Sequence, residues 1–356
     1  MRGIDTMGRL DSDTALLRLR LDTLNRQLAT GRRAEAPGDL APQLPRVAAL
    51  RAEAARRDTY GAAVGEARGR AEATQRALGR LSTIARDFGD GVAMKLEGGD
   101  PASIPLAAAR ARAAMVEVGH LLNTQQGGEY LFGGSDSANP PVPSPDDLPT
   151  SGFATLIAGA VAGLGGGNAA AVGAATRAAA ASDAPGTTPF SAFLSSGPGA
   201  TEPRRSVPAE DGATVPYGVP ANRNAAAMSS GETTGSWARD LLRGLASIAA
   251  LTPAHAAASP PTDFNAFAST VRDGLRSATN ALADEAGALG FAEARLEGVQ
   301  QRHADTNTAL AMQLADIEEV DLAAVLTGMK ATETALQASY ASIGRLGDLT
   351  LTRFLR

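Results

Sequence analysis

The residues that could support metal binding or nucleophilic catalysis are few and widely separated. The chain has three histidines, His120, His255 and His303, and no two of them have the H-x-x-x-H spacing that places two imidazoles on one face of a helix. It contains no cysteine, which excludes thiolate metal ligands and disulfides. We therefore predict no metal site and no catalytic residue of either kind.

Phosphate-binding and cation-binding patterns are also incomplete. Gly163 and Gly165 begin a G-x-G-x-x-G pattern, but its third glycine falls on Asn168. A P-loop needs a lysine after its second glycine, and the only lysines, Lys95 and Lys330, lie in segments that we predict to be helical. Two acidic pairs, Asp146–Asp147 and Glu318–Glu319, are more typical of solvated loops and helix ends than of cation sites. The sequence predicts no cofactor and no enzyme.

A seven-residue apolar repeat is the strongest structural signal. It runs through Leu275, Leu282, Leu289, Leu296, His303, Leu310 and Ile317. Such a stripe predicts one continuous helix over residues 263–317, which at about 1.5 Å per residue would span roughly 80 Å. A polar residue within such a seam usually fixes helix register, and we assign His303 that role.

Four further stripes predict four more helices. The first stripe contains Leu10, Leu17, Leu21, Leu24 and Leu28. The second runs from Val64 to Val92, the third from Ile104 to Leu122 and the fourth from Leu322 to Leu346. Gly31 is expected to end the first helix, and Asp100 to cap the third with Pro101 in its first turn. The acidic break around Glu319 should separate the last helix from the long one.

The central residues 135–235 lack a persistent repeat and hold 12 of the 20 prolines, which predicts a loop-rich or β insert between two helical arms. Residues 153–176 are uncharged, yet six glycines and Asn168 favour a flexible or weakly packed part of the insert over a membrane helix. Trp237 should open a short amphipathic helix that Pro253 closes. Since the stripes lie outside the insert, we expect the helices to fold without residues 139–220.

The predicted fold is mainly α, an elongated rod of long coiled-coil-like helices from both termini with a central loop-rich or β insert domain. We divide it into five segments: an N-terminal assembly helix at 1–42, an N-terminal helical rod at 43–134, a variable insert at 135–235, a C-terminal helical rod at 236–318 and a C-terminal assembly helix at 319–356.

A net charge of −5 gives no basic surface for nucleic acid. Charged residues from Arg2 to Asp13 interrupt the start, so export should not use a cleaved signal peptide.

Two segments resemble the flagellin superfamily. Near the end of the N-terminal arm, the family has a helix ending in Leu-Asn, then an aromatic-Leu-Phe-Gly-Gly turn and proline, matched here by Leu122, Asn123, Gly128, Tyr130, Leu131, Phe132, Gly133, Gly134, Pro140 and Pro141. Residues 317–356 resemble its C-terminal arm through Asp321, Leu322, Leu336, Gln337, Ala338, Ser339, Phe354 and Leu355, and Gly290, Arg295 and Leu296 resemble an element of its long helix. The resemblance covers about residues 1–142 and 263–356.

Two groups within this superfamily compete. Flagellins carry an Arg-Leu-Ser-Ser-Gly element followed by Ala-Ala-Asp-Asp-Ala-Ala-Gly, whereas this chain has Thr30, Gly31 and Arg32 followed by Pro37, Asp39 and Pro42. That pattern is more similar to the hook–filament junction group (hook-associated protein 3). The resemblance therefore implies a structural, motility-related subunit of the bacterial flagellum that links hook to filament, with flagellin as the alternative. A binding domain displayed on a coiled-coil stalk and an unrelated coiled-coil adaptor rank below both.

The terminal stripes are the expected site of action, because a lone amphipathic helix is marginal in water until it packs. We predict an assembly interface of Leu10, Leu17, Leu21, Leu24, Leu28, Leu322, Val325, Met329, Leu336, Tyr340, Ile343, Leu346, Phe354 and Leu355. By the resemblance, the partners are other copies of the chain, a hook-side junction protein, flagellin and an export chaperone, with no nucleic acid and no membrane insertion. The protein would be extracellular, in the flagellum, after export through the flagellar secretion channel.

Overall fold

A computed structural model describes residues 2–34, 42–97, 100–258 and 261–352. The chain forms two compact units, one of residues 1–59 with 303–356 and one of residues 60–302. Long helices dominate both units, and the sheets in the described residues have two strands each. The predicted mainly α fold is therefore confirmed. The five predicted segment boundaries stay a prediction.

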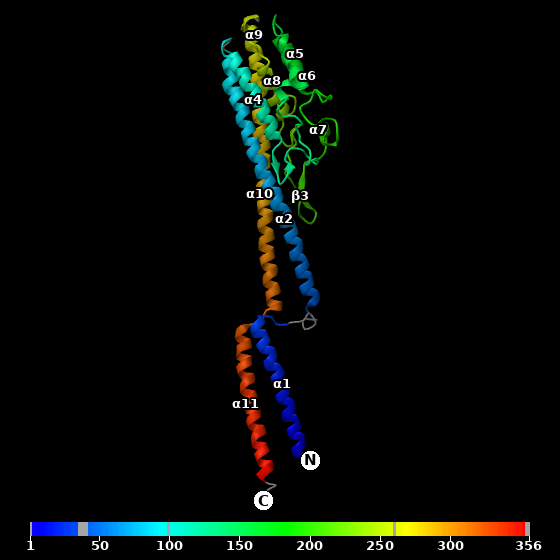
Figure 1. Ribbon diagram of the computed structural model, residues 1–356, viewed down its shortest axis with the longest axis vertical. Helices are drawn as coiled ribbons and strands as arrows, with labels where there is room; N and C mark the ends of the chain where they lie inside the picture. The colour runs from blue at the N-terminus through cyan, green and yellow to red at the C-terminus, as the bar shows by residue number, and fades with distance from the viewer. Residues whose placement is uncertain (1, 35–41, 98–99, 259–260, 353–356) are drawn as a thin grey trace. The chain divides into compact units, whose positions relative to one another are not determined.

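The first unit contains two terminal helices that lie side by side and antiparallel, α1 (Arg2–Thr30) and α11 (Leu322–Thr352) (Figure 1). Gly31 ends α1 with a positive φ of 67°, and its N–H donates to the Gln27 carbonyl at 2.8 Å. The Gly31 carbonyl accepts from the Val320 N–H at 3.1 Å. As predicted, an acidic break separates α11 from the helix before it.

The second unit is built on helices whose stripes are covered as predicted. Its helical framework comprises most of α2 (Leu44–Arg86) and α10 (Pro261–Glu318), together with the π-helix η2 (Asp87–Ala93), α3 (Met94–Leu96), α4 (Ile104–Leu122), α8 (Trp237–Ala249) and α9 (Pro253–Ala258). Leu275, Leu282, Leu289 and Leu296 of α10 have no exposed surface. The predicted long helix is thus present, and His303, at the edge of the first unit, is also buried.

The start of α4 differs from its prediction. Residues 101–103 form a turn, in which the Asp100 carboxylate accepts from the Ala102 N–H at 3.0 Å and the Asp100 carbonyl accepts from the Ser103 N–H at 3.2 Å. The helix then begins at Ile104 with Ser103 at its N-cap position. A turn closed on Asp100 takes the place of the expected cap, which moves the helix start three residues onward.

The central segment is an ordered helical and β layer. It contains η3 (Leu148–Thr150), α5 (Gly152–Ala162), α6 (Ala169–Ala180), α7 (Ala192–Ser195), η4 (Pro198–Ala200) and the antiparallel hairpin β3 (Ser206–Glu210) with β4 (Ala213–Pro216). Phe153, Ile157 and Val161 of α5 are fully buried. The expectation that residues 153–176 are flexible or weakly packed is wrong, because three large side chains on one face anchor α5. In the described part of the chain, no helix is long and apolar enough to span a membrane.

Helix α8 is buried on all sides, although its sequence predicts an amphipathic helix with one solvated face. All residues from Trp237 to Ile248 are buried. Its polar face packs against the central segment: Arg239 forms an ion pair with Asp183, and Arg243 forms one with Glu232 at 2.5 Å. The two buried guanidinium groups are therefore neutralised by carboxylates that lie outside the helical framework.

One apolar core joins the framework to the central segment. It includes Leu78 of α2, Leu282 of α10 and Phe153 of α5. Phe132, which follows the hairpin β1 (Gln125–Gln126) and β2 (Glu129–Tyr130), packs edge-on against Trp237 with 6.4 Å between ring centroids. The expectation that the helices fold independently of residues 139–220 is corrected by this shared core.

We expect Phe132→Ala to destabilise the second unit by about 3–5 kcal/mol, because it removes a fully buried ring and leaves a cavity beside Trp237. Phe291→Ala is the matched control, since Phe291 is 81% exposed and its loss should change stability by about 0.5 kcal/mol or less. Chemical denaturation followed by tryptophan fluorescence measures both. Similar losses for the two variants would contradict the shared core.

Candidate assembly interface

The predicted interface residues of α1 and α11 largely face each other. On α1, the predicted leucines are partly buried, and on α11 Val325 and Leu336 are 6% exposed each, with Met329 and Ile343 partly buried. Gly328 carries no side chain, and a Cβ there would lie 3.7 Å from Leu24. The apolar stripe of each helix is therefore covered by the other helix of the same chain. We call this contact between α1 and α11 the inner seam.

Polar contacts fix the register of this inner seam. Thr14, 3% exposed, donates to the Leu10 carbonyl at 2.7 Å, and its hydroxyl lies 2.8 Å from that of Ser339. The Arg18 guanidinium donates to the Tyr340 hydroxyl at 2.7 Å and lies 5.5 Å from the ring centroid. Thr14 and Ser339 are not among the predicted interface residues, because nothing local in the sequence indicates that their hydroxyls meet.

Four leucines lie outside the inner seam and form exposed outer faces. Leu16 and Leu19 of α1 are 63% and 62% exposed, and Leu322 and Leu326 of α11 are 49% and 43% exposed. Leu322 was predicted from its stripe, whereas the other three were missed because they fall between the stripe positions. Their spacing could have indicated them, since Leu16 and Leu19, like Leu322 and Leu326, are one turn apart on their helices.

Tyr340 is 45% exposed despite its contact with Arg18. The side chain of Leu346, and all of Phe354 and Leu355, lie outside the described residues. Contact of any predicted residue with another molecule stays a prediction.

The turn that resembles the flagellin superfamily is held by charge. The Glu129 carboxylate of β2 accepts from Arg70 of α2 at 2.7 Å and from Arg205 at 3.0 Å. Burial raises the pKa of Glu129, but hydrogen bonding and attraction to Arg205, with attraction to Arg70, outweigh it and place that pKa below its usual value. This carboxylate thus links the helical framework to the central segment just before Phe132.

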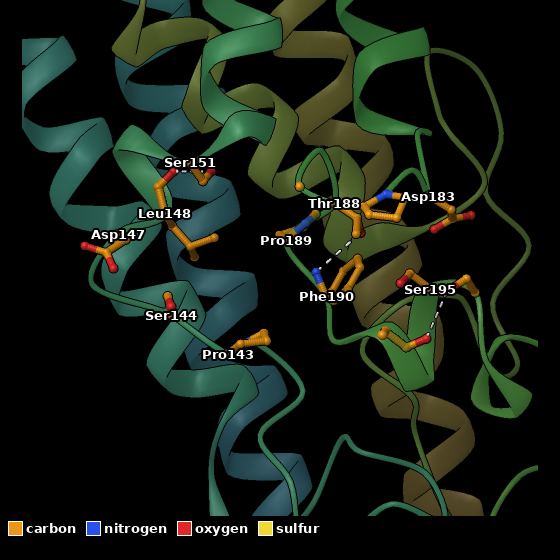
Figure 2. Close-up of a pocket in the computed structure, with 14 residues that line it drawn as sticks. Pro143, Ser144, Asp147, Leu148, Ser151, Asp183, Thr188, Pro189, Phe190 and Ser195 are labelled. Atoms are coloured by element: carbon orange, nitrogen blue, oxygen red, sulfur yellow. Dashed lines mark hydrogen bonds between the residues drawn. The ribbon is translucent and has the colours of Figure 1, made fainter.

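A hollow in the central segment offers an alternative binding site (Figure 2). It measures about 370 Å³ and lies between residues 143–151 and 183–196. The carboxylates lining it are those of Asp147 and Asp183, and Asp183 is already paired with Arg239. The described residues hold no group of three or more side chains suited to a metal, and the one histidine nearby in sequence, His120, pairs with Asp146 at 2.9 Å on the surface.

Comparison with known families gives a match to the bacterial flagellin C-terminal helical region, over residues 273–355. No curated protein matches the chain. The matched residues include most of α10 and all of the described part of α11, so they include one half of the inner seam. The match agrees with the resemblance of this part of the chain to the flagellin superfamily.

Leu336→Ala should weaken the inner seam by about 2 kcal/mol, because Leu336 is buried against α1. Leu326→Ala is the matched control on the same helix, and in the isolated chain it should change stability by about 0.5 kcal/mol or less because Leu326 is exposed. Limited proteolysis of the two termini, timed against the uncut wild type, reports the difference. Equal cleavage rates for both variants would show that α1 and α11 do not stabilise each other.

Proposed function

We propose that this chain is a structural subunit of the bacterial flagellum that links hook to filament through coaxial packing of its terminal helices. The observation that carries the proposal is the antiparallel pair α1 and α11, which satisfies one face of each helix within the chain and leaves the outer leucines exposed. The part of this pair on α11 lies within the match to the flagellin C-terminal helical region.

The free energy of burying the outer leucines favours assembly of several copies over an isolated α1–α11 helix pair. Full burial of a leucine contributes about 1.5–3 kcal/mol, so the four outer leucines together offer several kilocalories per mole to a neighbour that covers them. Association costs roughly 4–15 kcal/mol in lost freedom, so one such contact is marginal and several neighbours are needed. Packing of many copies around a common axis supplies those neighbours.

The junction role rests on residues 28–42. Thr30, Gly31 and Arg32, followed by Pro37, Asp39 and Pro42, are similar to junction proteins and depart from the flagellin pattern. Residues 35–41 lie outside the described residues. The proposed partners are other copies of the chain, a hook-side junction protein and flagellin, with an export chaperone before assembly. The proposed route of export is the flagellar secretion channel.

Flagellin itself is the second candidate, because the matched family is described by that name. The two roles need the same terminal helices and differ in how the assembly ends. Flagellin adds copies of itself without limit, whereas a junction subunit forms one short layer between two different partners.

We predict that the purified chain stays monomeric or forms small oligomers at micromolar concentration, and that it binds as a single layer to isolated hook ends. Electron microscopy after incubation with hook fragments, and separately after salting out, is the measurement. A hook preparation already capped by its own junction proteins serves as the control and should bind little.

Long, uniform filaments of this chain alone would replace the junction role with the flagellin role. Failure to bind any hook or filament fragment, in material whose helical circular dichroism is intact, would contradict both.

A further inference from the structure

We propose that the outer face of α1 binds the beginning of α11 from a second copy of this chain, through paired leucines and a cluster of arginines facing carboxylates. The inference rests on the proposed function, since it names the contact by which copies meet. The inference is based on two exposed surfaces of the first unit, whose charges and apolar residues are complementary.

The first surface contains a cationic hollow at the end of α1. It measures about 330 Å³ and is lined by Thr23, Arg26, Gln27, Thr30, Arg32, Arg33 and Ala34. The Gln27 amide donates to the Arg33 carbonyl at 3.0 Å, and the Thr30 hydroxyl accepts from the Arg32 N–H at 3.3 Å, so the backbone that carries the arginines is held in place. No carboxylate of a described residue lines this hollow.

Two of these arginines are available to a partner. The side chains of Arg32 and Arg33 are exposed and form no ion pair with any residue that the structure describes. Two cations side by side repel each other, and a carboxylate brought between them relieves that repulsion. The hollow is therefore suited to carboxylates.

An exposed apolar surface leads into the hollow. Leu16, Leu19, Thr23 and Arg26 follow each other at steps of three or four residues, so they lie along one side of α1. That side is turned away from the inner seam, as the exposure of Leu16 and Leu19 shows. A partner helix on this side would cover the leucines and reach the arginines.

The second surface is the beginning of α11, where carboxylates precede two leucines. Glu319 and Asp321 are exposed, and one Asp321 carboxylate oxygen accepts from the N–H groups of Ala323 and Ala324. Glu319 forms no ion pair with a described residue. Leu322 and Leu326 follow on the exposed side of the helix.

The two surfaces also meet at one point within a single chain. Arg32 and Glu319 form an isolated antiparallel backbone bridge, and the Arg33 N–H donates to the Glu318 carbonyl at 2.7 Å. The Arg32 and Glu319 side chains nevertheless remain exposed and form no ion pair with each other. The backbone contact therefore leaves both charges open to a second copy.

The spacings of the two surfaces agree when the helices run antiparallel. Leu19 precedes Arg26 by seven residues, or about 10 Å of helix, and Leu326 follows Asp321 by five residues, or about 8 Å. An antiparallel α11 would thus set its leucines near Leu16 and Leu19 while its carboxylates reach the arginines. The α11 of the same chain cannot cover Leu16 and Leu19 in this way, because it already occupies the inner seam of α1.

This contact joins two different surfaces, so every copy carries both halves. A heterologous contact of this kind repeats from copy to copy and gives a ring or a helical array. An acidic helix from another protein is the competing occupant of the α1 surface, and the experiment separates the two.

The test uses charge reversal with mixing, on the full chain and in the presence of hook or filament fragments. Arg32→Glu and Glu319→Arg, each alone, should reduce the assembled fraction at least about tenfold, because like charges then face each other. An equimolar mixture of the two variants should restore assembly. The reversed hollow of the Arg32→Glu variant then meets the reversed α11 start of the Glu319→Arg variant, and the unchanged hollow of the second variant meets the unchanged α11 start of the first. Sedimentation and electron microscopy measure the assembled fraction.

Arg345→Glu, which reverses an exposed arginine elsewhere on α11, is the matched control and should assemble like the wild type. Thermal melting by circular dichroism checks that each variant keeps its fold.

If both single variants assembled to the same fraction as the wild type, the contact between copies would be overturned while the proposed function stayed intact. A loss of assembly in the single variants that mixing does not restore would also overturn the contact between copies. Such a result would mean that the reversed charge acts within its own chain or disrupts binding to a different acidic protein, and mixing corrects neither effect. A wild-type chain that binds no fragment would instead remove the proposed function on which the contact rests.

Discussion

Burial of the apolar stripe of α10 is the constraint on which the rest of the structure depends. A helix of 58 residues with an apolar stripe that repeats every seventh position cannot remain solvated on that side, and the segments that cover it must come from far away in sequence. In the second unit, α8 and the π-helix η2 that continues α2 help to supply it, as the approach of Leu275 to Gly89 and Gly244 shows. Gly244 is required there, because a Cβ would lie 2.5 Å from a Leu275 methyl carbon.

Covering α10 with α8 creates a second requirement, because α8 carries charge on its other side. Buried guanidinium groups are costly unless carboxylates and hydrogen-bond acceptors surround them. Glu232 meets Arg243, while Asp183 and the Ala180 carbonyl meet Arg239. The central segment is thus more than an appendage, because it supplies the partners that allow α8 to be buried. The Glu129 carboxylate, held by Arg70 and Arg205, connects the same two parts at a second point.

The sequence predicted what depends on local periodicity and missed what depends on distant partners. The stripe from Leu275 to Leu296, the end of α1 at Gly31 and the break before Leu322 were all correct, because each follows from spacing or turn chemistry within a few residues. Burial of Arg239 and Arg243 could not be predicted, since their carboxylates are 11 to 56 residues away and follow no pattern. The packing of α5 was missed because its alanines and glycines resemble a flexible tract, although Phe153 and Ile157 mark the buried side. The contact of Thr14 with Ser339 within the chain could not be predicted, because nothing local in either segment pairs the two hydroxyls. The contact of the terminal stripes with other subunits stays a prediction.

The division of the terminal helices into an inner seam and outer faces has a mechanical consequence. The inner seam is fixed in register by Thr14 with Ser339 and by Arg18 with Tyr340, so α1 and α11 present their outer leucines in a constant relation to each other. A preorganised pair loses less conformational freedom on binding than two separate helices would, and contacts that are weak singly then add up over many copies. In the proposed contact between copies the two outer faces differ, so each added copy would expose a fresh surface of the kind it has just covered. Growth by such contacts has a direction, and the rotation between neighbours decides whether it closes into one layer or continues.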